Sequence, residues 1–534
     1  MTQPRIEYDA LIIGYGPVGA TLANLLGARG WRVAVIEKAA AIYDKPRAIT
    51  IDHEVMRIFQ ACGVAEEIAR SISIHPGTDF VGLSGEVIKR FVPQSAPHPL
   101  SWDPNIMFLQ PELEATLRAM ILRRDSVHVC LQHEMVQISQ DVGSVTVTTR
   151  DVETARMRTF HARYAIGCDG ANSLVRKTFL PSVDDLAFDE WWLVIDALID
   201  KPVELPPRCV QYCRPSRPGT YIVGPGRLRR WEIKVLPGED PREYESEASI
   251  RRVLSTFVDV SALELRRSAV YRFHALVAHE WRGDRVFLAG DAAHQMPPFL
   301  GQGLSAGVRD AANLAWKLNA VARDGANESI LDSYTVERKA HVRKIVEHAK
   351  TFGLIIGELD EAAARRRDDE LIAQLRRGEA ETVRQNFIPG LIDGLLDRDE
   401  NRRVRPPAGS LFIQPWVRSK DGKKVRLDDV VGSNFLLAAA SEGVKAWLDN
   451  DSQRLWERIQ GEWLILHQGE GKANARFTPF DSTFDTWLSR IGARVVIVRP
   501  DKYVYGAAAD AQQLRILVRN LHRDLFESGD ALVP

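Results

Sequence analysis

The stretch YDALIIGYGPVG, residues 8–19, decides the fold of this chain. Its first half is a short apolar run, typical of a strand buried on both faces. Gly14, Gly16 and Gly19 then follow the pattern G-x-G-x-x-G and lead into an apolar helix that runs to Leu26. In this pattern the first glycine permits a tight turn, the second lets the backbone approach a diphosphate, and the third lets helix and strand pack closely. The diphosphate would lie at the N-terminus of the helix.

A second apolar run, RVAVIE at residues 32–37, completes a strand–turn–helix–strand unit of about 30 residues. Glu37 ends this run, where a carboxylate can accept hydrogen bonds from both hydroxyls of an adenosine ribose. The glycine pattern alone would be a weak signal of function. Together with the two strands and the acid, it predicts a dinucleotide-binding unit.

Two further motifs indicate that the dinucleotide is a flavin. Asp169 and Asp291 each follow a buried strand and stand beside a glycine, where a carboxylate can reach a ribityl hydroxyl. The turn from Gly301 to Gly303 opens a long apolar helix, so its backbone N–H groups and the helix dipole favour negative charge. A reduced flavin carries such charge at its N1–C2=O edge, which suits this turn better than nicotinamide would.

The rest of the chain is organised around this unit. Its 534 residues are enough for several domains, and the stretch 188–275 alternates short β-rich runs with Pro and Gly turns. This texture predicts a mostly antiparallel sheet inserted into the first domain. Residues 1–187 are expected to form the first part of the dinucleotide-binding domain, and residues 188–275 the substrate-binding sheet. Residues 276–400 are expected to form the second part of the dinucleotide-binding domain, with a charge-dense helical connector, and residues 401–534 a small α/β domain.

Composition excludes several kinds of partner. The 70 Lys and Arg balance 71 Asp and Glu, so no broad field attracts nucleic acid or an anionic membrane. The charge-free run at residues 10–28 contains the glycine turn, and the N-terminus lacks a cationic leader, so we expect neither a membrane span nor a signal peptide. Five cysteines without a C-x-x-C motif fit a reducing cytoplasm. The histidines lack companion ligands at metal spacing, so no metal is expected.

Taken together, the motifs resemble the class A FAD-dependent aromatic hydroxylases, the p-hydroxybenzoate hydroxylase-like flavoprotein monooxygenases. The resemblance rests on the glycine turn, the two Asp–Gly motifs with the loop PPFLGQG, and the phrases PRA and FLQPELE. Longer phrases extend it over nearly the whole chain and favour the members that hydroxylate 3-(3-hydroxyphenyl)propionate. They are PRAITIDHEVMR (46–57), VLPGE (235–239), LFIQPWV (411–417) and RPDKYV (499–504).

The resemblance implies an α/β fold: a Rossmann-like FAD-binding domain, an inserted β-sheet domain and a thioredoxin-like C-terminal domain, here without redox cysteines. It implies FAD as cofactor, NAD(P)H as co-substrate, and hydroxylation of a phenolic acid by O₂ through a flavin C4a-hydroperoxide, in aromatic catabolism. Residues 304–306 read LSA where many relatives have an asparagine, so no flavin contact is assigned to Ser305. The residues expected to bind FAD are Gly14, Gly16, Pro17, Gly19, Glu37, Lys38, Arg47, Gln110, Val136, Asp169, Asp291, Pro298, Gly301, Gly303 and Leu304.

The protein itself must hold the aromatic ring and help to ionise the phenol, which requires a general base within hydrogen-bond reach. The candidates are Asp52, His53 and Tyr271, with His274 beside the last. The inserted sheet supplies possible pocket residues, although aromatic residues on strands are more often core, and Pro297 belongs to the flavin loop. These pocket candidates are Gln211, Tyr221, Trp231 and Pro297. One arginine of the sheet could pair with a substrate carboxylate, and the candidates are Arg214, Arg217, Arg227, Arg229 and Arg230.

Several alternatives stay open at this stage. The substrate could be a larger polycyclic or polyketide phenol, which would need a larger pocket in the inserted sheet. A flavin halogenase or reductase, or a non-catalytic FAD-binding protein, would share the cofactor motifs. The choice between NADH and NADPH and the formation of a homodimer are also open.

Overall fold

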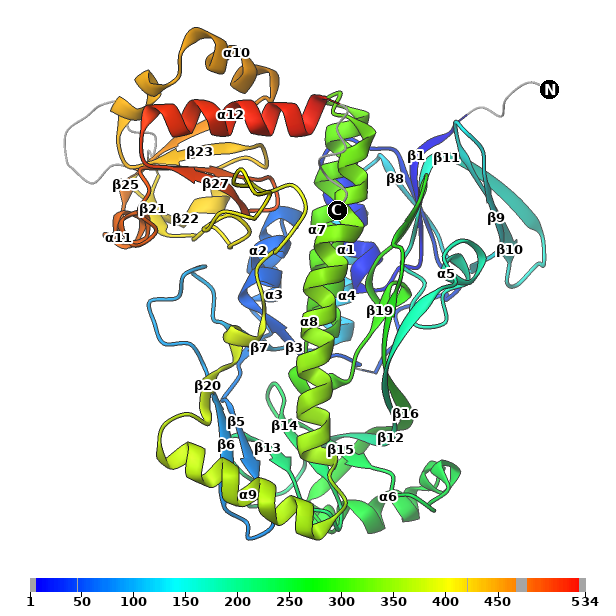
Figure 1. Cartoon of the computed structure of the whole chain (residues 1–534). Helices are drawn as coiled ribbons and strands as arrows, with labels where there is room; N and C mark the ends of the chain where they lie inside the picture. Colours follow the sequence, from blue (N-terminus) through cyan, green and yellow to red (C-terminus); the bar gives the residue numbers. More distant parts are fainter. Residues whose placement is uncertain (1–5, 46, 420, 467–477, 528–534) are drawn as a thin grey trace.

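The computed structural model describes residues 6–45, 47–419, 421–466 and 478–527. Pro46 of the PRA phrase lies outside these residues. Three β-rich units surround the long helix α8 (Asp332–Gly357), with an eight-stranded sheet at upper right, a nine-stranded sheet at the bottom and the C-terminal domain at upper left in Figure 1. Over the part of the chain that the structure describes, no helix combines the length and apolar character that crossing a membrane requires.

The eight-stranded sheet contains the predicted βαβ unit. β1 is entirely buried, as its apolar run predicts, and it pairs in parallel with β2 and β11. Helix α1 (Pro17–Gly27) follows β1 directly and packs against α4 (Gln110–Ile121) and α7 (Gly303–Ala322). The strands in spatial order are β17 (Arg282–Gly283), β18 (Val286–Leu288), β11 (Met157–Gly167), β1 (Tyr8–Ile13), β2 (Val33–Ile36) and β8 (Val127–Cys130), with β10 (Val145–Asp151) and β9 (His133–Gln140) continuing from β11.

The nine-stranded sheet is the inserted sheet, and most of its pairs are antiparallel. It is wider than the predicted range 188–275, because β5, β6 and β20 join it from segments that were assigned to the FAD-binding domain and its connector. The sheet therefore does not coincide with the predicted range, since strand pairing unites segments far apart in sequence. Its strands in order are β19 (His294–Gln295), β16 (Leu263–Ala278), β12 (Val183–Ile199), β15 (Leu228–Lys234), β14 (Gly219–Val223), β13 (Cys209–Tyr212), β5 (Thr78–Val81), β6 (Val87–Val92) and β20 (Glu381–Val383).

Shorter elements complete the first two units. A small sheet follows the glycine-rich region, and α2 starts directly after its first strand. The charge-dense segment forms the helix α9, which packs beside β6 at the bottom of Figure 1. These elements are β3 (Thr50–Asp52), β7 (Asn105–Met107), β4 (Ser73–Ile74), α2 (His53–Cys62), α3 (Ala65–Ile68), α5 (Leu174–Phe179), α6 (Glu247–Leu254) and α9 (Glu361–Arg376).

The C-terminal domain is built on a four-stranded sheet in the order β24-β23-β26-β27, in which only β23 and β24 run in parallel. Helix α10 links these two parallel strands. The elements are β23 (Leu436–Ala439), α10 (Asn450–Arg458), β24 (Glu462–Ile465), α11 (Thr483–Arg490), β26 (Val495–Val498), β27 (Val504–Ala508) and α12 (Ala511–Phe526), beside a small sheet of β21 (Trp416–Arg418), β22 (Lys424–Arg426) and β25 (Thr478–Pro479).

A buried ionic cluster fastens this domain to the rest of the molecule. Arg499 is fully buried and pairs with Glu337 of α8 at 2.7 Å and with Asp501 at 2.7 Å. Lys317 of α7 reaches the same Glu337 carboxylate at 2.8 Å. Since buried charges are tolerated only when they are paired, this cluster fixes the domain against α7 and α8.

Candidate functional site

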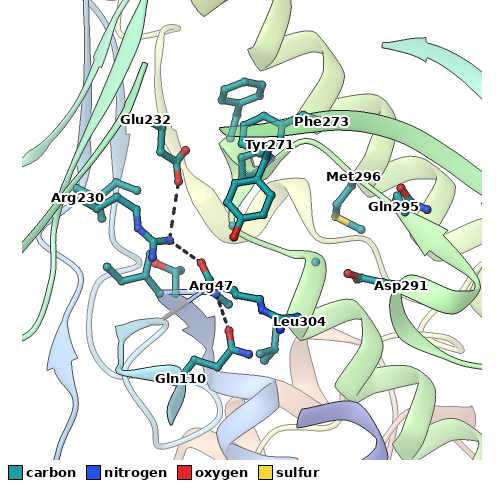
Figure 2. A pocket seen from close by; sticks show the side chains of 18 of the residues that line it. Arg47, Gln110, Arg230, Glu232, Tyr271, Phe273, Asp291, Gln295, Met296 and Leu304 are labelled. Carbon is teal, nitrogen blue, oxygen red and sulfur yellow. Dashed lines mark hydrogen bonds and ion pairs between the residues drawn. The ribbon is translucent and has the colours of Figure 1, made fainter. Parts of the chain in front are cut away.

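A cavity of about 450 Å³ lies between the two large sheets. Its upper wall consists of the N-termini of α1 and α7 and the loop that connects β18 to α7, and its floor consists of the nine-stranded sheet. Figure 2 shows side chains from both sides converging on this space. Its volume is within the range of cavities that bind small molecules.

The N-terminus of α1 is open toward the cavity. Gly14 has φ of +104°, which only glycine adopts readily, and a Cβ atom there would lie 2.3 Å from the carbonyl oxygen of Cys168. A Cβ atom at Gly16, by contrast, would meet no heavy atom within 4 Å. Among the described residues no side chain caps α1, and its first turn carries no acid, so the helix end can accept an anion. Gly16 and Pro17 both line the cavity.

The N-terminus of α7 faces the same cavity. Gly301 has φ of +58° and ends the short turn that precedes the helix, while Gly303 and Leu304 begin the helix and line the cavity. In the part of the chain that the structure describes, no side chain caps α7 either, and no acid lies in its first turn. Asp291 is exposed to the cavity, and its carboxylate has no hydrogen bond to any described residue. Two open helix ends and a free carboxylate fit the diphosphate, the flavin edge and the ribityl chain.

Glu37 and Asp169 are held in position by backbone N–H groups. The Glu37 carboxylate accepts hydrogen bonds from the N–H of Tyr15 at 2.7 Å and of Ala39 at 2.8 Å. It therefore lies beside the glycine turn and retains lone pairs for hydroxyl donors. One oxygen of Asp169 caps α5 by accepting from the N–H of Leu174 at 2.7 Å, while the other is buried with no partner among the described residues.

Gln110 and Arg230 fix the segment that contains Arg47. The Gln110 side-chain oxygen accepts from the N–H of Ala48 at 2.7 Å, and Arg230 donates to the carbonyl oxygen of Arg47 at 2.6 Å. Figure 2 shows these contacts as a chain along one side of the cavity. Arg47 and Gln110 line the cavity, as does Pro298 of the flavin loop.

Six of the fifteen residues expected to bind FAD are not among those that line this cavity: Gly14, Gly19, Glu37, Lys38, Val136 and Asp169. Lys38 is exposed beyond the end of β2, and Val136 is exposed on β9. Their contribution to cofactor binding stays a prediction.

The floor of the cavity carries a row of polar side chains. Gln211, Thr220 and Glu232 lie opposite one another on β13, β14 and β15, and directly paired residues project from the same face of a sheet. The Thr220 hydroxyl donates to the Gln211 side-chain oxygen at 2.5 Å. All three side chains are buried and line the cavity. The predicted pocket residue Gln211 is therefore at the site.

Glu232 is the acid of this floor, and its environment is unusual. The nearest cation is Arg230 at 3.9 Å, but the Arg230 guanidinium already forms a bidentate pair with Asp196 at 2.7 and 3.0 Å. Burial raises the pKa of Glu232 to about 7, which Arg230 only partly counteracts. Near neutral pH this carboxyl group can therefore both accept and release a proton.

Tyr271 reaches the cavity from β16 and is the one predicted catalytic residue that lies there, with His274 beside it. Its hydroxyl group receives a hydrogen bond from Arg267, which also pairs with Asp196 at 3.3 Å. In Figure 2 the Tyr271 ring points into the same space as Glu232 and Arg230.

The structure places the other two predicted bases outside the cavity. Asp52 is fully buried, caps α2 through the N–H groups of Glu54 and Val55, and pairs with Arg309 at 2.6 Å. His53 faces a second cavity next to the C-terminal segment, and burial lowers its pKa to about 4. Neither side chain lines the first cavity, so this geometry gives no support to Asp52 or His53 as the general base.

Three predicted pocket residues, Tyr221, Trp231 and Pro297, also do not line the cavity. Tyr221 and Trp231 lie opposite each other on β14 and β15, with ring centroids 5.3 Å apart, in the core on the far side of the sheet. Since side chains alternate along a strand, they face away from the cavity while Thr220 and Glu232 face into it. Pro297 is buried within the loop between β18 and α7, and its neighbour Pro298 lines the cavity instead.

Of the five arginine candidates of the sheet, Arg230 lines the cavity and the other four are engaged elsewhere. Arg214, Arg217, Arg227 and Arg229 donate to backbone carbonyls or, for Arg217, to Glu239, and they do not line the cavity. Another arginine, Arg384, lines the cavity but was not among the predicted residues. Arg384 follows β20, lines the cavity, donates to the carbonyl oxygen of Leu300, and takes part in no ion pair among the described residues. No local motif marked it, because strand pairing far along the chain brings it here.

Comparisons with known proteins agree with this site. Residues 7–349 match the family described as FAD binding domain, and residues 409–524 match the HcaD C-terminal domain. The chain is 32% identical to a 3-(3-hydroxy-phenyl)propionate/3-hydroxycinnamic acid hydroxylase of Comamonas testosteroni, covering 98% of both proteins. It is 33% identical to a "Probable NADH-specific resorcinol 4-hydroxylase" of Rhodococcus jostii, over 97% of this chain and 95% of that protein.

Solved structures share the fold over the full length. The flavin-dependent monooxygenase PieE, in complex with FAD and substrate, superposes with a TM-score of 0.80 at 21% identity, covering 98% of this chain and 99% of that one. Aklavinone-11 hydroxylase with FAD and aklavinone gives 0.76 at 23% identity, covering 97% and 99%. The family matches, the full-length relatives and the open helix ends lead to one conclusion: the chain belongs to the FAD-dependent aromatic hydroxylases.

Proposed function

We propose that this enzyme hydroxylates a phenolic acid of the 3-(3-hydroxyphenyl)propionate type, using NAD(P)H and O₂, in the breakdown of aromatic compounds. One observation carries the proposal: the glycine turn of α1 and the polar floor of Gln211, Thr220 and Glu232 line the same cavity. A cofactor held at the turn and an aromatic ring held on the floor would therefore lie next to each other. The names of the relatives with similar full-length chains support this substrate class.

The bound FAD would supply the redox chemistry, by taking up hydride and activating O₂. The residues we assign to holding it are Gly14, Gly16, Glu37, Arg47, Gln110, Asp169, Asp291, Gly301 and Gly303. The chain's own task is to bind the ring, orient it and exclude water. Phe273 and Phe299 line the cavity and pack edge to face with each other, and Phe299 also packs edge to face with Trp192, which gives the site an apolar wall. Tyr271 can donate a hydrogen bond to a phenolate.

A cofactor and turnover assay tests this function. Purified protein reconstituted with FAD should be yellow, and its oxidation of NADH or NADPH should accelerate when 3-(3-hydroxyphenyl)propionate is added. Resorcinol and a polycyclic phenol serve as competing substrates in the same assay. Reductant oxidation that no phenol stimulates would contradict the proposal. A clear preference for the polycyclic phenol would show that the substrate is a polycyclic phenol and not a phenolic acid.

Asp291→Ala is expected to weaken FAD binding without unfolding the protein. Its carboxylate makes no hydrogen bond to a described residue, so the fold loses nothing, whereas a hydrogen bond from a charged group is worth roughly a 10- to 100-fold change in affinity. FAD titration of the apoprotein measures the loss. Asp310→Ala is the contrasting variant, because Asp310 is buried and accepts hydrogen bonds from Gly290 and Arg338. Asp310→Ala should therefore lower the thermal stability of the protein. Normal FAD affinity in Asp291→Ala would count against this placement of the cofactor.

The fold type of the C-terminal domain and the cellular compartment of the protein are also proposals. The order β24-β23-β26-β27, with one parallel pair linked by α10, supports a thioredoxin-like C-terminal domain. All five cysteines are free thiols, which supports a reducing compartment such as the cytoplasm.

A further inference from the structure

We propose that Glu232 is the catalytic base of the reaction: its carboxylate accepts the proton of the substrate's phenolic hydroxyl. This inference rests on the proposed function and assigns the orientation of the substrate within the cavity. The phenol O–H bond breaks, the proton moves to a Glu232 Oε atom, and a phenolate remains on the cavity floor. No oxidant or further reactant takes part in this step.

The hydrogen bonding of Glu232 is incomplete in the protein alone. Its side chain is buried and lines the cavity, yet no described residue donates a hydrogen bond to it, and its nearest cation lies 3.9 Å away. Buried polar groups in folded proteins nearly always have partners, and an unsatisfied carboxylate is costly. A ligand that brings a hydroxyl donor to this position would supply the missing partner.

The neighbouring charges decide which ligand group fits. Arg230 and Arg267 both pair with Asp196, so both guanidinium groups beside Glu232 are already engaged by a carboxylate of the protein. A substrate carboxylate at this position would face the Glu232 carboxylate directly, and like charges in a buried site repel. A hydroxyl group is attracted instead. The phenol end of the substrate therefore lies at Glu232, and its acid side chain extends elsewhere.

Other acids near the cavity cannot take this role. Asp196 has both oxygens bound to arginines, and Asp52 is bound to Arg309 behind the wall. Asp291 lies on the opposite side, among the residues that we assign to FAD. Burial holds the pKa of Glu232 at about 7, so the group is a suitable proton acceptor at physiological pH.

Glu232→Gln tests the proposal, because glutamine keeps the shape of the side chain and removes its basicity. The kcat for 3-(3-hydroxyphenyl)propionate should fall by roughly 10²- to 10⁴-fold, the usual contribution of a general base. In the unaltered enzyme kcat should rise with pH through about 7 as Glu232 loses its proton. This rise should be absent from Glu232→Gln. Glu232→Asp, which keeps the carboxylate, should restore part of the rate.

A binding measurement gives a readout that does not depend on turnover. The substrate and its O-methyl ether are titrated into the FAD-loaded protein, and flavin absorbance reports the Kd. The unaltered protein should prefer the phenol by about 10-fold or more, because the ether leaves Glu232 without a donor. Glu232→Gln should lose most of this preference. Glu239→Gln, a glutamate of the same unit that pairs with Arg217 away from the cavity, should behave like the unaltered protein.

The outcomes separate this inference from the proposed function. If the unaltered enzyme hydroxylates no phenol, the proposed function fails. If it does so and Glu232→Gln retains its kcat, its pH dependence and its preference for the phenol, the function stands and the assignment of Glu232 is wrong. Circular dichroism and FAD content of the variant show that it is folded, and Glu232→Asp provides the second test if it is not.

Discussion

A Gly16→Ala chain is expected to fold normally but to bind FAD about 10- to 100-fold more weakly. A Cβ atom added at Gly16 meets no heavy atom within 4 Å, so the protein itself leaves room for a methyl group. That room belongs to the cavity beside the uncapped end of α1, where we place the diphosphate. The methyl group would therefore collide with the cofactor and not with the protein. FAD titration measures the affinity, and thermal unfolding of the apoprotein measures the fold.

Gly19→Ala is the matched control for this variant. A Cβ atom there would lie 2.1 Å from the carbonyl oxygen of Gly14, a backbone atom that cannot give way without moving the turn. We expect this chain to lose roughly 1–3 kcal/mol of stability as well as its FAD affinity. If Gly16→Ala bound FAD as tightly as the unaltered chain, the diphosphate would not lie at the end of α1.

Arg499→Met is expected to lower the free energy of unfolding by about 3–5 kcal/mol. The Arg499 guanidinium is fully buried and donates hydrogen bonds to both carboxylate oxygens of Glu337, at 3.0 and 2.7 Å, and to Asp501. Its removal leaves two buried carboxylates with Lys317 as their remaining nearby cation, 2.8 Å from Glu337. Urea unfolding of the whole chain, followed by tryptophan fluorescence, measures the loss.

The same cluster predicts a dependence of stability on pH. Burial alone would raise the pKa of Glu337, but Arg499 and Lys317 hold it at about 2, below its ordinary 4.5. The stabilisation is therefore complete above pH 4.5 and is lost as the pH falls toward 2. Arg499→Met should show a smaller loss over this window. Arg454→Met, which breaks an exposed pair with Asp451 in the same domain, should leave unfolding unchanged. Equal stability of both variants would contradict the role of the cluster.

The nucleotide-binding part of the site follows from local sequence. Gly14, Gly16 and Gly19 act through backbone geometry that one short segment determines, so the predicted turn, strand and helix coincide with β1 and α1. The same holds for Asp291 and the Gly301 turn, which follow their strand within a few residues. Local motifs of this kind can be predicted because their conformation depends on few distant contacts.

The substrate side could be predicted only in part, because it depends on which face each strand turns to the cavity. The inserted sheet was expected, but a shift of one residue exchanges the faces, so Tyr221 and Trp231 were assigned to the pocket while Thr220 and Glu232 occupy it. Glu232 did carry a signal: it is the acid in a strand that is otherwise apolar or basic. The register that places it opposite Thr220 is not visible in the sequence.

Contacts between segments far apart in the chain determine where Asp52 and Arg384 lie. The position of Asp52 after the PRA phrase suggested a general base. In the structure Asp52 is buried, caps α2 and pairs with Arg309 of α7. Arg384 reaches the cavity only because β20 pairs with β6, which lies far earlier in the chain. Such contacts join segments that no local pattern relates.

Isotope analysis of the product tests whether the cavity brings a phenolic acid to a bound flavin for hydroxylation. FAD-loaded enzyme is incubated with 3-(3-hydroxyphenyl)propionate, NAD(P)H and oxygen-18 gas, and the product is analysed by mass spectrometry. The expected product has gained one oxygen atom, which carries the heavy isotope from the gas. Consumption of the reductant with release of peroxide and recovery of unchanged phenol would contradict the proposed function.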